Sequence, residues 1–519
     1  MAKQYDYVIG MDCGTTNIKA VVLRSDGAVV AEASRPSRFL NPGANMHEQD
    51  AREWVRNAFD IFRSLTSQIG QEAIGHVRGI CVSSHTVSML PVDAGIVPLR
   101  PALTVMDGRS AAEVEEVVRA VGKERYVHIV GGRPSASFLP NRILWFKKNE
   151  PELFAKTAYF MQASSLINYH LTGEVTADVD QAIRSQCMDV STMDWSPEIG
   201  NAIGVDLKKV LPRIVQIDEV IGTVTEDAAT ETGLVPGIPV LGGCSDAMAA
   251  MQATGMSRLG EAGESSGTTS LVFVGSNVRS RPDVPVVSLP CTIPGMPWIF
   301  DAPITSTGAA IQWYIEKFAA EERHYAETHG LNIYDYLNEL ALQSTPGAHG
   351  LIFIPYLSGE RAPIWNDYAR GMFIGLRMDT SRADLIRSVF EGTAFALRHV
   401  VETTKKEGAK ADLLRVCGGG AKSRTWNQIK ASMLNIPVYV LAETSGNVPV
   451  GSALIAGHET GVFPDLMEAA KRVVKVSEVI EPNPEWAAVY DSLFPYYIEM
   501  YQHLDADLKR LQRTLHSLG

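Results

Sequence analysis

The amino-acid sequence predicts an α/β protein of two domains, and three observations carry this prediction. The first third of the chain reads as strand, strand, strand, helix, strand. The tripeptide Gly-Thr-Thr stands in a turn between two apolar segments twice, within residues 9–22 and within 262–274. The chain has 519 residues, enough for two or more domains of roughly 100–200 residues each.

The first elements follow from their apolar patterns. Residues 6–13, 18–24 and 28–33 are apolar runs separated by turn residues, which predicts a meander of three strands. Residues 48–69 space their apolar side chains for one face of a helix. The run 78–83 is typical of a buried strand.

The remaining elements are predicted more coarsely. Residues 141–171 are mostly helical in pattern, and 234–243 contain an apolar strand among Pro and Gly. The second Gly-Thr-Thr segment suggests a duplicated fold, although so short a tripeptide can also recur by chance. Apolar residues at helical spacing over 484–516 predict a docking helix, with a cofactor-binding stripe as the alternative.

Composition restricts the class of protein. With 47 basic and 59 acidic residues, the net charge of −12 argues against a nucleic-acid or acidic-membrane partner. The charge does not exclude an anionic ligand, because backbone amides bind phosphate whatever the net charge.

The cysteines and the N-terminus indicate a protein of a reducing compartment, and we expect it to be cytoplasmic. Six cysteines in 519 residues are too few for a disulfide scaffold, and no C-x-x-C pair suggests a zinc or redox site. The first twelve residues lack the apolar core of a secretory signal. Residues 234–256 contain Asp246 and glycines and make a poor membrane span.

Two glycine turns carry candidate phosphate-binding chemistry. In the first, Asp12 ends a strand and is followed by Gly14, Thr15 and Thr16, so that a carboxylate stands beside backbone N–H groups and hydroxyls. Such a turn suits phosphate oxygens, and its carboxylate suits Mg²⁺. Residues 265–269 repeat the turn, and the two together could hold a polyphosphate; ordinary hairpins are the alternative.

Two further motifs follow apolar strands. Gly418, Gly419 and Gly420 precede a probable helix and would let a flat ligand approach the backbone, although a plain tight turn explains them equally well. Asp246 follows the strand over 234–243 and lies where an α/β domain places its reactive groups. Capping of the following helix is the simpler role for this carboxylate.

Asp107 and Arg109 form a short acid–base pair in a loop, and His85 follows the strand over 78–83. The pair could hydrogen-bond a polyol or be a solvated salt bridge, and a lone histidine is more often structural than functional. Hydrolase and metalloenzyme motifs are missing from the sequence.

Taken together, these motifs resemble the FGGY carbohydrate kinases. The most specific resemblance is the segment 371–391, which matches the second family signature at every constrained position. Residues 357–365 look like the xylulokinase and gluconate-kinase branch, and residues 305–313 and 418–420 also match. The resemblance covers nearly the whole chain in the family's order.

The resemblance implies a fold and a reaction. It implies two ribonuclease H-like, actin-type α/β domains that flank a catalytic cleft, here assigned to 1–247, with the sugar site and the base, and 248–519, with the nucleotide site and the C-terminal helix. It also implies ATP as co-substrate, Mg²⁺ as cofactor and a small sugar or polyol as acceptor. Homodimers are common in the family, so a homodimer is an open expectation.

The resemblance also implies roles for individual residues. Asp246 matches the general base, and Asp12 matches the residue beside Mg²⁺ and the phosphates. The implied ATP-binding positions are Gly14, Thr15, Thr16, Gly267, Thr268, Thr269, Gly308, Gln312, Gly419, Gly420 and Ala421. The implied sugar-binding positions are Ser84, His85, Thr86, Asp107 and Arg109.

The sugar side departs from the family's pattern while the ATP side does not. His85, Thr86 and Val87 stand where xylulokinases usually have Gln-Met-His, and Val105 replaces a frequent Trp. Arg142 stands where the first family signature has Lys. The sequence therefore predicts a sugar kinase with a non-standard acceptor.

A xylulose-type ketopentose is the first choice of acceptor, with gluconate or another aldonate, a hexulose, and a tetritol or pentitol as alternatives. Two alternatives belong to other classes. One is an actin-like ATPase of the heat-shock chaperone type, which would leave residues 371–391 unexplained. The other is a sugar sensor without activity, which the presence of Asp12 and Asp246 disfavours.

Overall fold

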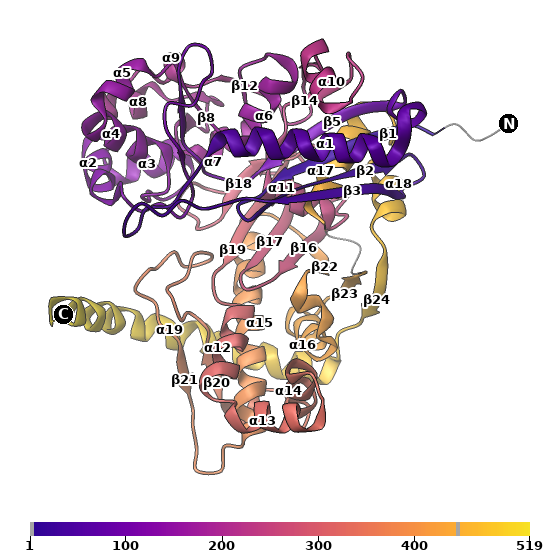
Figure 1. Ribbon diagram of the computed structural model, residues 1–519. Helices are drawn as coiled ribbons and strands as arrows, with labels where there is room; N and C mark the ends of the chain where they lie inside the picture. The colour runs from indigo at the N-terminus through magenta and orange to yellow at the C-terminus, as the bar shows by residue number, and fades with distance from the viewer. Residues whose placement is uncertain (1–4, 443–446, 519) are drawn as a thin grey trace. The chain divides into compact units, whose positions relative to one another are not determined.

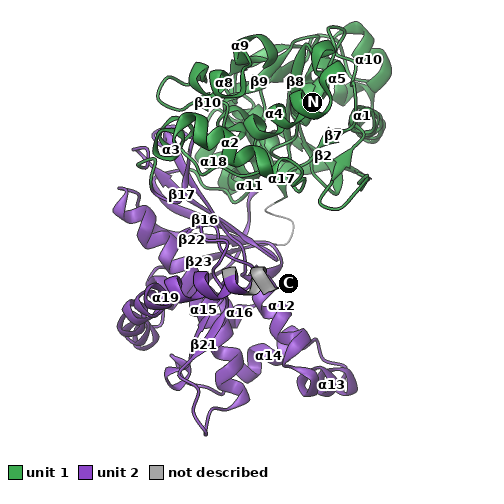
Figure 2. Ribbon diagram, turned by 90° about the vertical axis from the view of Figure 1, so that its left-hand side faces the viewer, with its two compact units in different colours: residues 1–257, 281–283, 447–473 green, residues 258–280, 284–446, 474–519 purple. Residues whose placement is uncertain are grey.

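The computed structural model describes residues 5–442 and 447–518 and divides the chain into two compact units (Figure 2). Unit 1 comprises residues 1–257, 281–283 and 447–473, and unit 2 comprises 258–280, 284–446 and 474–519. The expected division at residue 247 gives two continuous stretches, whereas residues 447–473 return to unit 1 because their helix packs on the first sheet.

Each unit is built on a seven-stranded sheet, in the order β13-β14-β5-β1-β2-β3 with β15 beside β5, and β18-β19-β17-β16-β22-β23-β24 (Figure 1). The strands of the first sheet are β1 (Tyr7–Cys13), β2 (Asn17–Arg24), β3 (Val29–Pro36), β5 (Val77–Ser84), β13 (Val220–Thr223), β14 (Pro239–Leu241) and β15 (Cys244–Ser245). Those of the second are β16 (Gly260–Ser266), β17 (Ser270–Ser276), β18 (Val287–Pro290), β19 (Trp298–Ile304), β22 (Ala411–Cys417), β23 (Val438–Leu441) and β24 (Val476–Ile480).

Helices and two-stranded ribbons complete the units. The helices of unit 1 are α1 (Ala51–Ile74), α2 (Ala111–Val121), α3 (Lys123–Val130), α4 (Leu139–Asn149), α5 (Pro151–Lys156), α6 (Ala163–Thr172), α7 (Val179–Ser185), α8 (Pro197–Ile203), α9 (Leu207–Val210), α10 (Glu226–Thr232), α11 (Asp246–Ala253), α17 (Val448–Glu459) and α18 (Leu466–Val473). Those of unit 2 are α12 (Gly308–Lys317), α13 (Ala320–His329), α14 (Ile333–Ala341), α15 (Arg382–Lys406), α16 (Arg424–Leu434) and α19 (Pro484–Leu518). The short strands are β4 (Glu48–Gln49), β6 (Leu90–Val92), β7 (Ala102–Leu103), β8 (Tyr159–Met161), β9 (Thr176–Asp178), β10 (Met188–Asp189), β11 (Asp194–Trp195), β12 (Arg213–Val215), β20 (Ile352–Ile354) and β21 (Met372–Ile374).

The predicted duplication is confirmed by the strand pairing. In unit 1, β1, β2 and β3 form an antiparallel meander and β5 pairs parallel to β1. In unit 2, β16, β17 and β19 form the same meander and β22 pairs parallel to β16. Each Gly-Thr-Thr tripeptide connects the first two strands of its meander, as the sequence predicts. This repeated motif is the ribonuclease H-like core that the resemblance implies.

Two sequence predictions differ from the structure in detail, and a third is confirmed. The first long helix begins at Ala51 rather than residue 48, because the side chain of Asp50 accepts a hydrogen bond from Arg52 N and caps it. The region 141–171 is interrupted by β8, which pairs with β6. The C-terminal helix is confirmed and extends over Pro484–Leu518.

Alternation along β1 assigns its two faces to different helices. Ile9 and Met11 are buried in the apolar cluster that also holds Trp54 and Phe62 of α1. Gly10 points the other way, where a Cβ atom would collide with backbone atoms of α17. Because side chains alternate along a strand, Asp12 lies on the same face as Gly10.

Glycine at position 451 lets α17 approach α11, the helix that begins at Asp246. A Cβ atom there would lie within 3.0 Å of backbone atoms of Ala249 and Ala253. We expect Gly451→Ala to lower the free energy of unfolding by about 3 kcal/mol, because backbone cannot yield as a flexible side chain can. Urea unfolding would measure this. Gly75→Ala is the control, since its nearest neighbour would lie at an ordinary 3.5 Å, and equal losses in both variants would contradict the prediction.

Candidate active site

The first candidate residue is Asp12, which stands at the carboxyl end of β1. Its side chain is buried, its Oδ1 accepts a hydrogen bond from Ser83 Oγ at 3.1 Å, and it pairs across the sheet with Lys19. The pKa of Asp12 is raised to about 8, first by burial and then by the nearby carboxylate of Asp246, while Ser83 and Lys19 partly offset the shift. A cation bound nearby would stabilise the ionised form of a carboxylate held in this way.

Asp246 is the first residue of α11 and follows β15, which pairs parallel to the end of β5. The helix cap is Ser245, whose Oγ accepts a hydrogen bond from Met248 N at 3.1 Å. The capping role considered for Asp246 is therefore wrong. The Oδ1 atom of Asp246 accepts a hydrogen bond from Ala247 N at 2.8 Å. The negative charge of Asp246 raises the pKa of Asp12.

The two carboxylates lie near enough to interact because the strands that lead to them run in one direction. β1, β5 and β15 pair parallel and end at one edge of the sheet, with Asp12 opposite Ser83 and Ser245 opposite Ser84. The carboxyl ends of parallel strands are where α/β proteins place reactive groups. This edge therefore brings together the predicted base and the predicted phosphate-side carboxylate.

The residues that follow β5 contain buried polar atoms without a hydrogen-bond partner among the described residues, with His85 buried and Thr86 half-buried. His85 Nδ1 lies 2.9 Å from the carbonyl oxygen of Cys13, and the ring meets Trp54 edge-on. A carbonyl only accepts, so Nδ1 carries the hydrogen; burial lowers the pKa of His85 and keeps it neutral. Its Nε2 is then an acceptor, and neither it nor Thr86 Oγ1 has a hydrogen-bond partner among the described residues.

The hydroxyl oxygen of Ser84 accepts hydrogen bonds from other residues of the protein. Its Oγ accepts hydrogen bonds from Ser164 N at 3.1 Å and from Gln181 Nε2 at 3.0 Å. Of the predicted residues around β5, His85 and Thr86 thus retain polar atoms for a ligand, whereas both lone pairs of the Ser84 hydroxyl are used.

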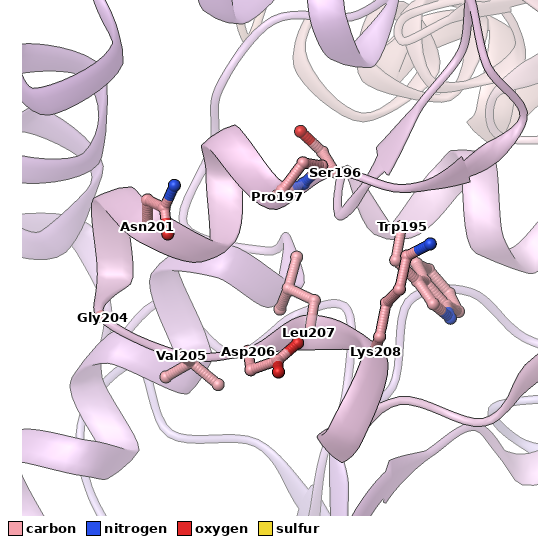
Figure 3. Close-up of a pocket in the computed structure, with 9 residues that line it drawn as sticks. All are labelled: Trp195, Ser196, Pro197, Asn201, Gly204, Val205, Asp206, Leu207 and Lys208. Carbon is pink, nitrogen blue, oxygen red and sulfur yellow. The ribbon is translucent and has the colours of Figure 1, made fainter.

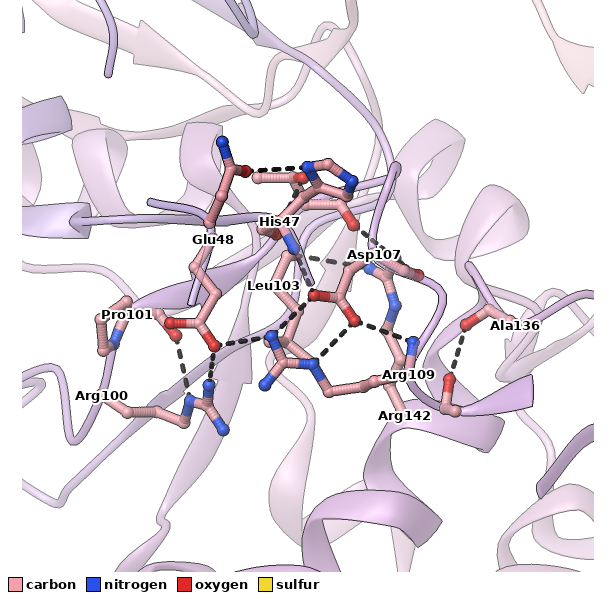
Figure 4. Close-up of polar contacts among 12 residues, drawn as sticks. His47, Glu48, Arg100, Pro101, Leu103, Asp107, Arg109, Ala136 and Arg142 are labelled. Atoms are coloured by element: carbon pink, nitrogen blue, oxygen red, sulfur yellow. Dashed lines mark hydrogen bonds and ion pairs between the residues drawn. The ribbon is translucent and has the colours of Figure 1, made fainter. Parts of the chain in front are cut away.

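Asp107 and Arg109 form a buried network (Figure 4) rather than the solvated salt bridge considered from the sequence. Asp107 Oδ1 accepts from Arg109 Nε at 2.8 Å, and Oδ2 accepts from His47 N and Arg109 Nη2, each at 2.7 Å. Arg109 also binds Glu48 at 2.7 Å, and Glu48 binds Arg100. The pair therefore fixes its own loop, and both groups are already balanced.

Arg142 of α4, which lies beside Asp107 and Arg109 (Figure 4), connects the two loops that carry the predicted sugar-binding residues. Its guanidinium donates to the carbonyl oxygens of Val87 at 3.0 Å, Thr104 at 2.5 Å and Asp107 at 3.3 Å. Its side chain is fully buried, and burial lowers its pKa to about 10. The sequence showed Arg142 as a departure from the family but gave no sign of this role, because the partners are backbone atoms of distant loops.

The first Gly-Thr-Thr turn lies between β1 and β2 at the same edge as Asp12. Gln49 Nε2 donates to the carbonyl oxygen of Thr15 at 2.7 Å, and Ser37 N donates to that of Thr16 at 2.8 Å. These bonds fix the turn that Gly14 begins. The sequence did not single out Gln49, which also accepts a hydrogen bond from Trp54.

In unit 2, the second turn is joined to the start of α12. Gly308 N donates to the carbonyl oxygen of Gly267 at 3.2 Å, and Ala309 N donates to that of Thr268 at 2.9 Å. A Cβ atom on Gly308 would collide with Gly267. The structure thus brings Gly267, Thr268 and Gly308 together, with Thr269 on the same turn.

The glycine run after β22 packs on the strand that leads into this turn. Gly418 has φ +87° and no room for a side chain beside Ser266, while Gly419 faces open space. Gly420 also lies against Ser266, and Ala421 is buried. Gly419 is therefore the member of the run that leaves backbone open to a flat ligand.

Gln312, further along α12, binds neighbours of its own unit. Its Nε2 donates to Glu316 at 2.8 Å, and its Oε1 accepts from Tyr334 at 2.6 Å. Lys430 was missed by the sequence analysis: its Nζ binds Glu264 Oε2 at 2.8 Å and Ser266 Oγ at 3.2 Å in the interior of unit 2.

A separate groove of about 430 Å³ lies at α8 and α9 of unit 1 (Figure 3). Its lining residues are Trp195, Ser196, Pro197, Asn201, Gly204, Val205, Asp206, Leu207 and Lys208. None of these is a predicted site residue. Among the described residues, no helix is long and apolar enough to cross a membrane.

The duplicated ribonuclease H-like units, with paired carboxylates at one sheet edge and a glycine turn in each, define a phosphotransferase of the actin-like class. Models of the N-terminal and C-terminal domains of the FGGY family of carbohydrate kinases match residues 7–252 and 264–460. The chain belongs to this family, and it is a carbohydrate kinase.

Individual relatives agree with this assignment over nearly their full length. The chain is 26% identical over 512 residues to a xylulose kinase of Bacillus subtilis, covering 98% of this chain and 100% of that protein. It is 29% identical to an L-fuculokinase of Escherichia coli, covering 90% and 95%. The crystal structure of a xylulose kinase from Rhodospirillum rubrum has a TM-score of 0.88 and 29% identity, covering 97% and 100%.

The raised pKa of Asp12 predicts a pH dependence of stability. The folded protein binds a proton at Asp12 up to a pH of about 8, whereas an unfolded aspartate releases it near pH 4. Without divalent cations, the free energy of unfolding should therefore fall as pH rises from about 4 to 8, by a few kcal/mol.

Urea unfolding at several pH values would measure this slope, and Asp12→Asn should flatten it. The control is Asp227→Asn, which removes an exposed carboxylate of the same unit. A slope that is equally steep in wild type and in Asp12→Asn would contradict the assignment.

Proposed function

We propose that this kinase transfers the γ-phosphoryl group of ATP to a hydroxyl of a xylulose-type ketopentose. The carrying observation is the pair Asp12 and Asp246 at one sheet edge, beside the buried and unpartnered polar atoms of His85 and Thr86. This arrangement supplies a base, a cation-binding carboxylate and groups for sugar hydroxyls within one unit.

Asp246 is proposed as the general base. It takes the proton of the acceptor hydroxyl as that oxygen bonds to the γ-phosphorus and the bond to the ADP oxygen breaks. Ser245 holds it at the first position of α11. A positioned base contributes roughly 10²–10⁴-fold to such a step, so most of the catalysis comes from positioning and charge neutralisation.

Asp12 is proposed to hold Mg²⁺. Its carboxylate oxygens are ligands of the kind that Mg²⁺ prefers. Burial and the charge of Asp246 destabilise the ionised form of Asp12, and a bound cation would stabilise it. Across the described residues, no cluster of three or more His, Cys, Asp or Glu could hold a metal alone. Mg²⁺ would therefore be held by Asp12 with waters and phosphate oxygens, and it would neutralise phosphate charge.

The nucleotide is proposed to bind through backbone more than through side chains. Its positions are Gly14, Thr15, Thr16, Gly267, Thr268, Thr269, Gly308, Gln312, Gly419, Gly420 and Ala421. Support comes from the two fixed turns and from the open backbone at Gly419. Turns with backbone N–H groups at glycines suit phosphate oxygens.

A neutral acceptor is favoured over an aldonate by the state of the sugar-side arginines. Arg109 is bound to Asp107 and Glu48, Arg100 to Glu48 and Glu150, and Arg142 to backbone carbonyls. An aldonate carboxylate would have to displace one of these partners. Among the relatives, the names xylulose kinase and L-fuculokinase agree with a neutral sugar, whereas a gluconokinase of Bacillus subtilis, also 26% identical, is named for an aldonate.

The acceptor can be identified by measuring ADP release with Mg·ATP across ketopentoses, ketohexoses, aldonates and C3–C5 polyols. We expect the highest kcat/KM with a ketopentose of the xylulose type. A preference for gluconate would contradict the argument from the arginines while leaving the kinase assignment intact. The cytoplasm, which supplies ATP, is the proposed location.

Replacement of the base should separate catalysis from binding. We expect Asp246→Asn to lower kcat by about 10²–10⁴-fold, while the sugar, followed by calorimetry, binds within about threefold of its normal affinity. Asp227→Asn makes the same change at an exposed position and should keep full activity. If Asp246→Asn releases ADP at the normal rate, the base assignment is wrong.

A further inference from the structure

A short buried helix, α7, connects the ends of the two strands that precede the proposed site residues. It begins after Asp178, whose Oδ1 accepts a hydrogen bond from Gln181 N at 2.8 Å and caps the helix. Two adjacent residues of its first turn, Asp180 and Gln181, are buried and contact different strands. The resemblance and the motifs gave neither residue a role.

Asp180 binds the residue that precedes the base. Its Oδ2 accepts hydrogen bonds from Ser245 N at 2.9 Å and from Ser245 Oγ at 2.5 Å. The single hydroxyl hydrogen of Ser245 thus points to Asp180, which leaves an oxygen lone pair for Met248 N. Asp180 therefore sets the direction of the cap and of the turn from which Asp246 projects.

Gln181 holds the last residue of β5, Ser84, as Asp180 holds Ser245. Its Nε2 donates to the carbonyl oxygen of Ser84 at 3.2 Å and to Ser84 Oγ at 3.0 Å. Ser84 directly precedes His85. One helical turn thus holds the residue before the proposed base and the residue before His85, and so it sets the spacing of Asp246 and His85.

The charge of Asp180 is balanced on its other oxygen. Oδ1 accepts from Arg184 Nε at 2.9 Å on the same helix. Each oxygen of the carboxylate therefore has its own donors, and an amide cannot replace it: the NH₂ group of an asparagine would face either Arg184 Nε or Ser245 N, both of which are donors.

We infer that Asp180 is a positioning residue for phosphoryl transfer, acting on Asp246 through Ser245. The inference rests on the proposed role of Asp246 as base. A small displacement of a catalytic group costs rate far more than it costs affinity. The competing explanation is an ordinary buried ion pair that stabilises the fold and affects catalysis only through the amount of folded protein.

The first test is Asp180→Asn in the full chain, with Mg·ATP and the best acceptor from the panel. We expect kcat to fall about 10–100-fold, while calorimetric affinities for the sugar and for ATP stay within about threefold. The matched control is Asp178→Asn on the same helix. Burial raises the pKa of Asp178, and asparagine caps a helix equally well; the kcat of this variant should be unchanged.

The second test is a double-mutant cycle with the base. If Asp180 acts through Asp246, Asp180→Asn should lower kcat in the wild type and have little effect when Asp246→Asn is already present. Equal fold-losses in both backgrounds, or a normal kcat in folded Asp180→Asn protein, would overturn the inference.

These variants distinguish failure of the proposed base from failure of the proposed role of Asp180. A normal rate in the single variant Asp246→Asn would refute the proposed base, whatever Asp180→Asn does. If Asp180→Asn fails to fold, Ser245→Ala carries the same cycle, because it removes the hydroxyl contact and keeps the pair of Asp180 with Arg184. Ser245→Ala is then expected to lower kcat, and an unchanged kcat overturns the inference.

Discussion

The parallel pairing of β5 with both β1 and β15 is the constraint on which the candidate site depends. It ends three strands at one edge and leaves Asp12 and Asp246 as neighbours, although 233 residues separate them in the sequence. Burial is the main cause of the raised pKa of Asp12, and repulsion by the nearby carboxylate of Asp246 is the second. The fold tolerates this arrangement because Ser83 and Lys19 offset part of the cost, and a bound cation would offset more.

The duplication shows how the two units divide the chemistry. Both meanders carry Gly-Thr-Thr, but the residue that corresponds to Asp12 in the second is Ser265. The charged groups of unit 2 near its turn, Glu264 and Lys430, neutralise each other in the interior. The first turn thus offers a carboxylate together with backbone N–H groups, whereas the second offers N–H groups and hydroxyls alone, as suits a nucleotide that brings its own charge.

The sequence predicted those parts of the molecule that local pattern determines. The meanders, both glycine turns, α19 and the position of Asp246 at a strand end follow from periodicity and turn residues. The contacts of Asp180, Gln181 and Arg142 could not be predicted, because their partners lie 35–97 residues away and are often backbone atoms. For the same reason the sequence could not show that Asp107 and Arg109 balance each other in a buried network.

The unpartnered atoms of the site suggest how the acceptor is selected. A buried polar group without a partner costs about 1–3 kcal/mol, and here His85 Nε2 and Thr86 Oγ1 are both in that state. A sugar that offers hydroxyl groups to both recovers that cost on binding, whereas an analogue lacking one hydroxyl leaves it in place. Because His85 is neutral and its Nε2 only accepts, it requires a donor from the ligand, and a hydroxyl supplies one where a carboxylate does not. On the proposed assignment, the replacement of the Gln-Met-His that is usual in xylulokinases therefore changes which hydroxyl is recognised and leaves the phosphoryl-transfer groups as they are.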